Sequence, residues 1–586
     1  MKTLMDVLRA AAPSPHGVRF VAGDETTRFY RYREILERSL RMAGWYREQG
    51  VQAGDTVALV LPTGIGFFDA FFGAIAIGAV PVPMYPPIRL GRLDEYHDRS
   101  ARMLAGCAAS LLVTERRIHR VLGRTIERYS PPRGVAVLEQ IGLDAYSALD
   151  HSALDASSRD SDALAFVQFS SGTTALPKPI ALTHEQVVAN VDAIMDQILT
   201  AYPEDDTFQH RGCSWLPLYH DMGLVGCVFV SMNRPRDLVL IPPEQFVARP
   251  VLWLRALSTW GGTISPAPNF AYSLCVDRIR DQELEGVDLS KWCVAMNGAE
   301  PVTPRVLEAF VERFGAFGLR PESLTPVYGL GEASLAVTFS SLPKSWSWSS
   351  FDRDALAEQA RARVVERGGV DLVSLGPPLP GFDIDIRDGE HSLDEGTLGD
   401  VWIRGPSLMR GYLGLDELNE EVFDGDWLDT GDRGFLYEGE LYLFGRRKDT
   451  IVVRGRNYAA QDIEHALDGM EGIRPGGLAA IGRLEDGGEQ LWILAETGLS
   501  GPDERAELVE RIQSAVFERC SLACRVELLE RGTLPRTSSG KVGRARAREL
   551  IEAGQLRAPK PVNAPRMLAE VFRSMRGHRR SLRGRR

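Results

Sequence analysis

Residues 167–178 read VQFSSGTTALPK, and this stretch sets the interpretation of the whole chain. The apolar run through Phe169 predicts a strand, which leads into a loop of hydroxyl-bearing residues around Gly172. Hydroxyl groups, backbone N–H groups at the glycine and the ammonium of Lys178 could converge on phosphate oxygens. A Walker P-loop is excluded because Pro177 stands directly before the lysine, where that motif requires glycine. A plain surface turn rich in serine and threonine is the alternative for this stretch alone.

The composition is that of a globular enzyme with more than one domain. The chain has 586 residues, 44% of them hydrophobic and 25% charged, and this length exceeds a single ordinary core. The net charge of −11 argues against nucleic acid as a partner. The seven cysteines are scattered and contain no C-x-x-C pair, which disfavours a disulfide framework or a zinc site and favours the reducing cytoplasm. We expect no secretory signal, and the longest apolar stretch, 67–84, is too interrupted for a transmembrane segment.

The spacing of apolar residues predicts the fold class. Strand-like and helix-like segments alternate through residues 1–160, which indicates a largely parallel sheet. Residues 184–199 have helical spacing, which would place the phosphate loop near a helix start. We therefore expect an α/β fold with a large N-terminal domain, 1–447, of mixed and parallel sheets with helices. Short alternating strands predict that a β-rich subdomain forms its end, over about 376–447.

Two further segments follow. Residues 448–555 predict a small, mobile α+β C-terminal domain. Residues 556–586 concentrate arginine with few acids, and the simplest expectation is a solvated, disordered tail. The alternative is an electrostatic dock for an acidic carrier protein, or a peripheral contact with an anionic membrane surface.

Several other stretches combine polar side chains with apolar flanks. His220 stands beside an aspartate in SWLPLYHDMGLVG and could orient a carboxylate, although a hydrogen-bonded histidine at a strand end fits equally well. In TPVYGLGEASLAV, Tyr328 could stack on a base and Glu332 could hold Mg²⁺. WLDTGDRGFL offers carboxylates for ribose hydroxyls, and PRTSSGKVGR is a basic turn around Lys541. Each stretch, taken singly, is as consistent with a structural role.

The combination of motifs is more specific than its parts. SSGTTALPK, YGLGE, TGD, GRRKD and PRTSSGK occur in the order and spacing of the adenylate-forming enzymes, and the resemblance covers about residues 1–550. That superfamily comprises acyl-CoA synthetases, firefly luciferase and nonribosomal-peptide adenylation domains. SWLPLYHDMGLVG, MNGAEPV, VYGLGEASLAV and KDTIVVRGRNYAAQDIE resemble its fatty acyl-AMP ligases. Residues 338–375 resemble the insertion of those ligases, which is thought to restrain rotation of the small domain, whereas PKPI at 177–180 departs from the usual continuation of the phosphate loop.

This resemblance implies an enzyme that activates a fatty acid with ATP and Mg²⁺ and releases pyrophosphate. The acyl group would pass to the phosphopantetheine thiol of an acyl carrier protein, or of a carrier domain in a polyketide or nonribosomal-peptide synthase. A long-chain fatty acyl-CoA synthetase is the alternative within the same fold, favoured if residues 338–375 pack away from the small domain. A peptide-type adenylation domain is disfavoured because PAPNFAYSL, 266–274, offers no acid to a substrate amine. A non-catalytic adenylate-binding or scaffold protein is the alternative from another class.

The resemblance also implies roles for individual positions. Lys541 matches the lysine that bridges the carboxylate and the α-phosphate during adenylation, and His220 would position the carboxylate. Glu332 would ligate Mg²⁺, and Lys448 matches the hinge about which the small domain turns. The positions expected at the nucleotide are Ser170, Ser171, Gly172, Thr173, Thr174 and Lys178 at the phosphates, Gly298, Ala299 and Tyr328 at the adenine with Asn297, Glu300 and Gly329 beside them, and Asp432 and Arg446 at the ribose.

Overall fold

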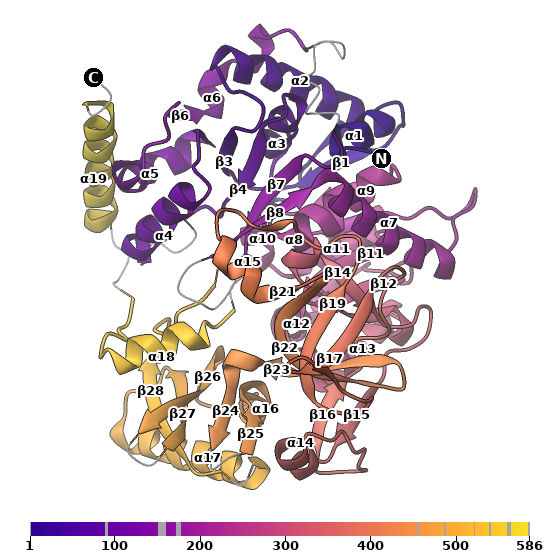
Figure 1. Ribbon diagram of the computed structural model, residues 1–586, viewed down its shortest axis with the longest axis vertical. Coiled ribbons are helices and arrows are strands. Elements are labelled where there is room, and N and C mark those ends of the chain that lie inside the picture. The colour runs from indigo at the N-terminus through magenta and orange to yellow at the C-terminus, as the bar shows by residue number, and fades with distance from the viewer. Residues whose placement is uncertain are drawn as a thin grey trace.

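Figure 1 shows the computed structural model of the chain. It describes residues 2–87, 92–149, 160–170, 177–453, 456–485, 488–520, 522–537, 541–559 and 564–583. The α/β class is confirmed: a large N-terminal part of parallel and mixed sheets with helices carries a β-rich subdomain, and a smaller α+β unit follows it.

A four-stranded parallel sheet in the order β4-β3-β5-β6 confirms the alternation predicted for the first 160 residues. Helix α3 (Ile65–Ala76) is apolar on every side and is buried from Phe67 to its end, and its single acid, Asp69, accepts two hydrogen bonds from Arg38 at 2.9 and 2.6 Å. The other elements of this region are β3 (Thr56–Val60), β4 (Val80–Pro83), β5 (Leu111–Thr114), β6 (Val135–Val137), α1 (Leu4–Ala11), α2 (Tyr32–Glu48), α4 (Leu93–Gly106), α5 (Arg116–Arg128) and α6 (Leu138–Ile141).

An eight-stranded sheet in the order β14-β13-β12-β11-β9-β10-β1-β2 forms the centre of the molecule. Its inner strands are parallel and both edge strands are antiparallel, so the carboxyl ends of β12 and β13 meet at one edge, where α/β enzymes usually bind ligands. The strands are β1 (Gly17–Val21), β2 (Thr27–Arg31), β9 (Gly212–Ser214), β10 (Leu238–Leu240), β11 (Ile264–Pro268), β12 (Val294–Gly298), β13 (Leu324–Gly329) and β14 (Ala336–Phe339). The helices of this region are α8 (Asp221–Gly223), a π-helical segment (Leu224–Phe229), α9 (Val230–Asn233), α10 (Pro243–Ala248), α11 (Val251–Trp260), α12 (Asn269–Arg278) and α13 (Pro304–Phe314).

The candidate phosphate loop joins two antiparallel strands, β7 (Leu164–Phe169) and β8 (Pro179–Thr183), and β20 (Gly411–Tyr412) pairs with β8. The expectation that phosphate lies near a helix start is therefore wrong. Helix α7 (His184–Ala201) begins at the far end of β8, where the Thr183 side chain caps it. A strand advances about 3.3 Å per residue, so β8 carries the chain away from the loop before the helix begins.

A six-stranded antiparallel sheet occupies the range expected to be β-rich. The preceding stretch, 338–375, folds onto it as a two-stranded ribbon and one helix, and Phe351 and Leu356 of this stretch bury against Phe435 and Tyr442 of the sheet. The elements are β15 (Trp348–Phe351), α14 (Arg353–Gln359), β16 (Val370–Val373), β17 (Asp383–Asp388), β18 (His391–Ser392), β19 (Gly399–Arg404), α15 (Asp416–Val422), β21 (Phe423–Asp424), β22 (Trp427–Tyr437) and β23 (Glu440–Arg446).

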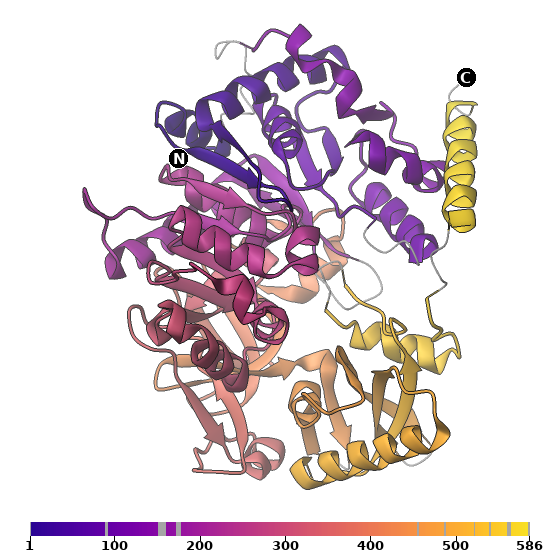
Figure 2. The same cartoon turned by 180° about the vertical axis from the view of Figure 1, so that it is seen from behind.

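The chain then forms a smaller α+β unit, seen at the bottom left of Figure 1 and the bottom right of Figure 2. Its three-stranded sheet has the order β26-β27-β28, and it has its own hydrophobic core, with Ile463, Ile493 and Ile512 at its centre. The elements are β24 (Thr450–Val453), β25 (Arg456–Ala459), α16 (Ala460–His465), β26 (Ile473–Glu485), β27 (Gly488–Thr497), α17 (Pro502–Cys520), β28 (Cys524–Glu530) and α18 (Arg544–Glu552).

The last described segment is a helix, α19 (Ala564–Arg583), which lies beside α5 in both views (Figures 1 and 2). The expectation of a disordered tail is therefore wrong for these residues. A glycine on each helix, Gly123 and Gly577, lets the two backbones approach so closely that a Cβ at either position would collide with the other helix. Among the described residues, no helix has the length and apolarity needed to cross a membrane.

Candidate functional site

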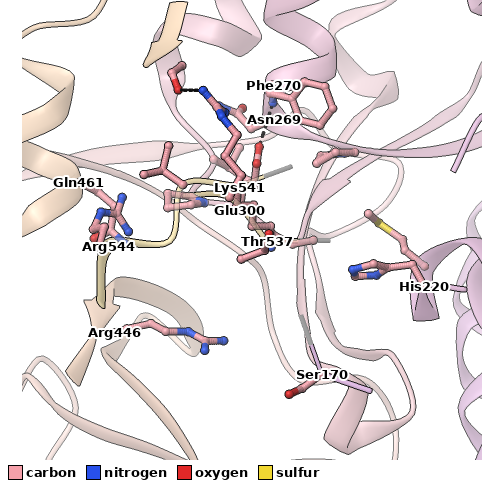
Figure 3. Close-up of a pocket in the computed structure, with 18 of the residues that line it drawn as sticks. Ser170, His220, Asn269, Phe270, Glu300, Arg446, Gln461, Thr537, Lys541 and Arg544 are labelled. Carbon is pink, nitrogen blue, oxygen red and sulfur yellow. Dashed lines mark hydrogen bonds between the residues drawn. The ribbon is translucent and has the colours of Figure 1, made fainter. Parts of the chain in front are cut away.

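A cavity of about 2120 Å³ lies where the β7–β8 hairpin, the ends of β12 and β13, the β22–β23 hairpin and the small unit meet. In Figure 3, Lys541 and Glu300 project into this space, and His220 faces it from another element. The sequence-predicted residues on its wall are Ser170, Lys178, His220, Ala299, Glu300, Tyr328, Gly329, Glu332, Asp432, Arg446, Lys448 and Lys541.

Ser170 and Lys178 close the base of the candidate phosphate loop. The Ser170 N–H donates to the Lys178 carbonyl at 2.9 Å, and the Lys178 N–H donates to the Ser170 hydroxyl at 3.1 Å. Ser171, Gly172, Thr173 and Thr174 lie outside the described residues, so their predicted phosphate contacts stay predictions. Both described ends of this stretch, Ser170 and Lys178, line the cavity.

Lys178 and Glu332 are joined through Tyr412. The Lys178 ammonium donates to the Tyr412 hydroxyl at 3.5 Å and lies 4.6 Å from its ring centre, and that hydroxyl donates to Glu332 Oε1 at 2.9 Å. Burial lowers the pKa of Lys178, while Glu332 opposes this shift. The arrangement holds a cation and a carboxylate on one side of the cavity, next to the phosphate loop.

Asp432 connects the end of β13 to the β22–β23 hairpin. Its Oδ2 accepts a hydrogen bond from the Tyr328 hydroxyl at 2.9 Å, and its Oδ1 pairs with Arg446 Nε at 3.1 Å. Burial, followed by the Asp432 charge, raises the pKa of Tyr328, so the phenol stays a hydrogen-bond donor. The predicted proximity of Asp432 and Arg446 is thus present, and both residues line the cavity.

The end of β12 presents backbone and carboxylate groups to the cavity. Ala299 has a φ of +63°, a left-handed conformation that turns its carbonyl toward Lys541. Glu300 accepts the Phe270 N–H at 3.0 Å. Asn297 and Gly298 do not line the cavity: Asn297 is buried and donates to Asn269 at 3.0 Å, and a Cβ on Gly298 would meet Val327 at 2.7 Å.

His220 is held by its sequence neighbour. Its Nδ1 lies 2.7 Å from Asp221 Oδ1, which also accepts the Met222 N–H at 2.7 Å, and its Nε2 is buried without a partner among the described residues. Burial alone would raise the pKa of Asp221, but His220 and the Met222 N–H outweigh burial and lower it. An ionised Asp221 therefore fixes the imidazole with its Nε2 free to meet a ligand.

Lys541 comes from the small unit and reaches across the cavity, where its ammonium donates to the Ala299 carbonyl. Burial lowers the pKa of Lys541, and the nearby Glu300 carboxylate opposes that shift. Other charges around it belong to Arg446, Asp221 and Asp432. A cation from the small unit thus stands among the groups predicted to hold the carboxylate and the ribose.

Lys448 lies between two residues whose ion pairs join different parts of the molecule. Arg447 pairs with Asp400 and Asp429 of the β-rich sheet, both at 2.6 Å, and Asp449 pairs with Arg544 of α18 at 3.0 Å. The ion pairs of the chain therefore change from the β-rich sheet to α18 within three residues.

Sequence reasoning missed Tyr412, which bridges Lys178 and Glu332. It stands in the short stretch MRGYLG, which matches none of the predicted motifs, and only the pairing of β20 with β8 brings it to Lys178. Arg447 and Asp449 were also missed, although their charges flank the predicted hinge. The signal for these two residues was the change from three cations to an acid in RRKD.

A metal ion in this cavity would have Glu332 as its carboxylate ligand. Across the described ranges, no group of three or more His, Cys, Asp or Glu side chains could hold a metal ion by itself. Mg²⁺ commonly binds through one or two carboxylates together with phosphate and water oxygens. Glu332, on the cavity wall beside the phosphate loop, fits a Mg²⁺ ion that arrives with a nucleotide.

Comparison with known proteins gives four consistent matches. The family model described as AMP-binding enzyme matches residues 8–413. The long-chain-fatty-acid–AMP ligase FadD32 of Mycolicibacterium smegmatis is 31% identical over 572 residues, covering 88% of this chain and 88% of that protein. A Caulobacter vibrioides protein whose name includes acyl-CoA synthetase is 31% identical over 562 residues, covering 94% of this chain and 96% of that protein. A solved structure from a study of fatty acyl-adenylate ligases of E. coli and L. pneumophila matches with a TM-score of 0.87 at 32% identity, covering 94% of this chain and 98% of that one.

Proposed function

The chain belongs to the AMP-binding enzyme family, and on this premise we propose that it activates a fatty acid with ATP as the acyl-adenylate and then transfers the acyl group to the phosphopantetheine thiol of a carrier protein. The observation that carries the adenylation step is the position of Lys541. Its ammonium stands in the cavity beside Ala299, and Asp432 and Glu332 line the same cavity.

In the first half-reaction, a carboxylate oxygen of the fatty acid attacks the α-phosphorus of ATP. The bond from that phosphorus to the bridging oxygen breaks, and pyrophosphate leaves. No proton is transferred, because a fatty carboxylate is already ionised at neutral pH. The barrier is the crowding of negative charge, so catalysis requires cations and hydrogen-bond donors that are already in place.

The residues of the cavity fit these requirements. Lys541 would bridge the carboxylate and the α-phosphate, and His220 with a proton on its Nε2 would donate a hydrogen bond that positions the carboxylate. Ser170 and Lys178, with the loop between them, would hold the β- and γ-phosphates. Asp432 and Arg446 would bind the ribose, and Mg²⁺, held by Glu332, would neutralise phosphate charge.

In the second half-reaction, the thiol sulfur attacks the acyl carbonyl carbon, the bond to the AMP oxygen breaks, and the thiol proton passes to water. We place a hinge for the movement between the two steps at Lys448. This also sets the proposed boundary between the N-terminal domain and the small domain. The anchors on Arg447 and Asp449 support this position, since they leave the torsions of one residue to absorb the rotation.

The contacts of residues 338–375 favour a carrier protein over free CoA as acceptor. Arg353 of α14 forms a buried ion pair with Asp462 of the small unit, and Arg519 of that unit lies 3.8 Å from Asp371. A long-chain fatty acyl-CoA synthetase would be favoured if this stretch packed away from the small unit. The observed contacts support its action as an insertion that restrains rotation.

A non-catalytic adenylate-binding or scaffold protein is the second candidate. The gathering of Lys541, Glu332 and Asp432 on one cavity argues against it, because a scaffold has no chemical need for all three. Fatty-acid-dependent exchange of labelled pyrophosphate into ATP tests the difference. We expect exchange with at least one member of a ladder of fatty acids. Absence of exchange with every carboxylic acid would support the scaffold.

A further inference from the structure

Helix α19 packs on α5 through its small and polar face. The Ser574 hydroxyl accepts the Gly123 N–H at 2.8 Å, and both Ser574 and Glu570 are buried. His578 stacks on His119, with ring centres 4.1 Å apart. The helix is therefore seated on the N-terminal part of the chain, on an element remote in sequence.

A buried ion network fixes this docking. Glu570, 4% exposed at its side chain, lies 3.2 Å from the His97 ring and 3.6 Å from Arg124. The other ring nitrogen of His97 lies 2.9 Å from the Thr125 hydroxyl. Glu570 also pairs with Arg573 of its own helix at 2.8 Å, so this acid both fixes the helix on α5 and orients a half-exposed arginine.

The face that points away from α5 carries large apolar side chains between arginines. Phe572 is 63% exposed and Met575 is 47% exposed, and Arg573 and Arg576 lie beside them. A helix that served only to cover α5 would turn Phe572 and Met575 inward. Here the order is reversed, with Glu570, Ser574 and Gly577 inside and the large apolar groups in solvent.

The charge of this segment opposes that of the rest of the chain. Residues 564–586 contain eight arginines and one glutamate, a net charge of +7, so the other residues sum to −18 within the total of −11. A charge of this sign attracts an anionic surface, whereas the acidic remainder of the protein is repelled by it. An orientation with α19 toward such a surface is the one that the charge distribution favours.

We propose that the outer face of α19 binds an anionic lipid bilayer, lying flat in the interface between headgroups and acyl chains. The combination of Phe572 and Met575 with Arg573 and Arg576 on one face is the pattern of interfacial helices, in which apolar groups enter the acyl boundary and arginines meet lipid phosphates. Because α19 is already helical and packed on α5, this face is exposed before the protein meets a membrane. An acidic protein would offer the same negative charge, but it would lack the hydrocarbon layer in which Phe572 and Met575 could both be buried.

The test uses the full-length protein with vesicles in a flotation assay. We expect binding to vesicles that contain phosphatidylglycerol and not to vesicles of phosphatidylcholine alone, with release at high salt. Phe572→Ser should weaken binding by about tenfold. Phe517→Ser is the matched control, because Phe517 is 61% exposed but lies on α17 of the small unit, and it should bind as the unaltered protein does. Arg576→Glu should weaken binding at low salt by about tenfold.

Adenylation of a short, water-soluble acid is measured on each variant to verify folding, and it should not change. The proposal is overturned if the unaltered protein does not float with anionic vesicles, or if Phe572→Ser and Phe517→Ser weaken flotation equally. It is also overturned if sedimentation shows that the face joins two copies of the chain, or if an acidic carrier protein competes for it while vesicles do not bind.

Discussion

Arg353 of α14 and Asp462 of α16 form an ion pair across the junction between the stretch 338–375 and the small unit. Their side chains are only 15% and 8% exposed, and Arg353 also donates to the Gly369 carbonyl at 3.1 Å. Removing one partner of a buried pair typically costs several kcal/mol, because the other charge is left without compensation. The pair therefore favours the orientation in which Lys541 reaches the cavity.

Arg353→Met should release the small unit and raise the rate of acyl transfer to CoA. We expect an increase of about tenfold, which corresponds to roughly 1.4 kcal/mol in the balance of orientations. The change is limited because Arg519 still pairs with Asp462 at 3.3 Å. Single-turnover formation of acyl-CoA from preformed adenylate gives the measurement. Arg363→Met is the control, since Arg363 forms its ion pair with Asp352 inside the same stretch; equal effects of the two variants would refute the account.

Lys541→Ala should slow adenylate formation by about 10² to 10³, the usual cost of removing one transition-state donor. Pyrophosphate release with saturating ATP and fatty acid measures this step. The neighbouring Arg546→Ala removes a cation of α18 that pairs on the surface with Glu549, so it should leave the rate unchanged. Normal adenylation by Lys541→Ala would remove the proposed role.

Lys448→Pro should slow transfer more than adenylation, because proline fixes the φ torsion on which rotation depends. Lys448→Ala leaves both torsions free and serves as the comparison. The two half-reactions are followed separately, as pyrophosphate release and as acyl loss from preformed adenylate. Equal losses in both steps for the proline variant would argue against a hinge.

Acid should destabilise the fold through His184. Burial lowers the pKa of His184 from its ordinary 6.5 to about 4, and its Nδ1 accepts the Leu4 N–H at 3.3 Å. Between these two pKa values the unfolded chain binds more protons than the folded chain. The free energy of unfolding therefore decreases as the pH falls from 6.5 toward 4. At pH 5 the loss is about 2 kcal/mol. Urea unfolding measures the free energy of unfolding at pH 7 and at pH 5. The decrease between the two should be smaller for His184→Gln than for the unaltered protein, and an identical decrease would contradict the assignment.

Much of the fold and site could be predicted because the determining signals are local. The hydroxyl-rich loop after a strand, the alternation of strands and helices, and the short strands after residue 376 are all visible in sequence. The motifs also placed Asp432, Arg446 and Lys541 near one another before any contact was known, and the cavity contains all three.

The remaining features depend on packing between distant segments. Tyr412 acquires its partners only when β20 pairs with β8, and nothing near it in sequence indicates those contacts. The sequence of the Arg-rich end predicted disorder because its helix is stabilised by packing on α5. That packing depends on the close approach at Gly123, which neither segment indicates by itself. The start of the helix at His184 was predicted correctly, but the strand within PKPIALT that separates this helix from the candidate phosphate loop was not.

The central claim is that this enzyme makes acyl-adenylate and transfers the acyl group to a carrier protein. The most direct measurement incubates it with Mg·ATP and a ladder of fatty acids, adds either free CoA or a phosphopantetheinylated carrier protein, and identifies the products by mass spectrometry. The account predicts that acyl-adenylate accumulates with CoA and that acyl-carrier forms with the carrier protein. Ready formation of acyl-CoA would contradict it.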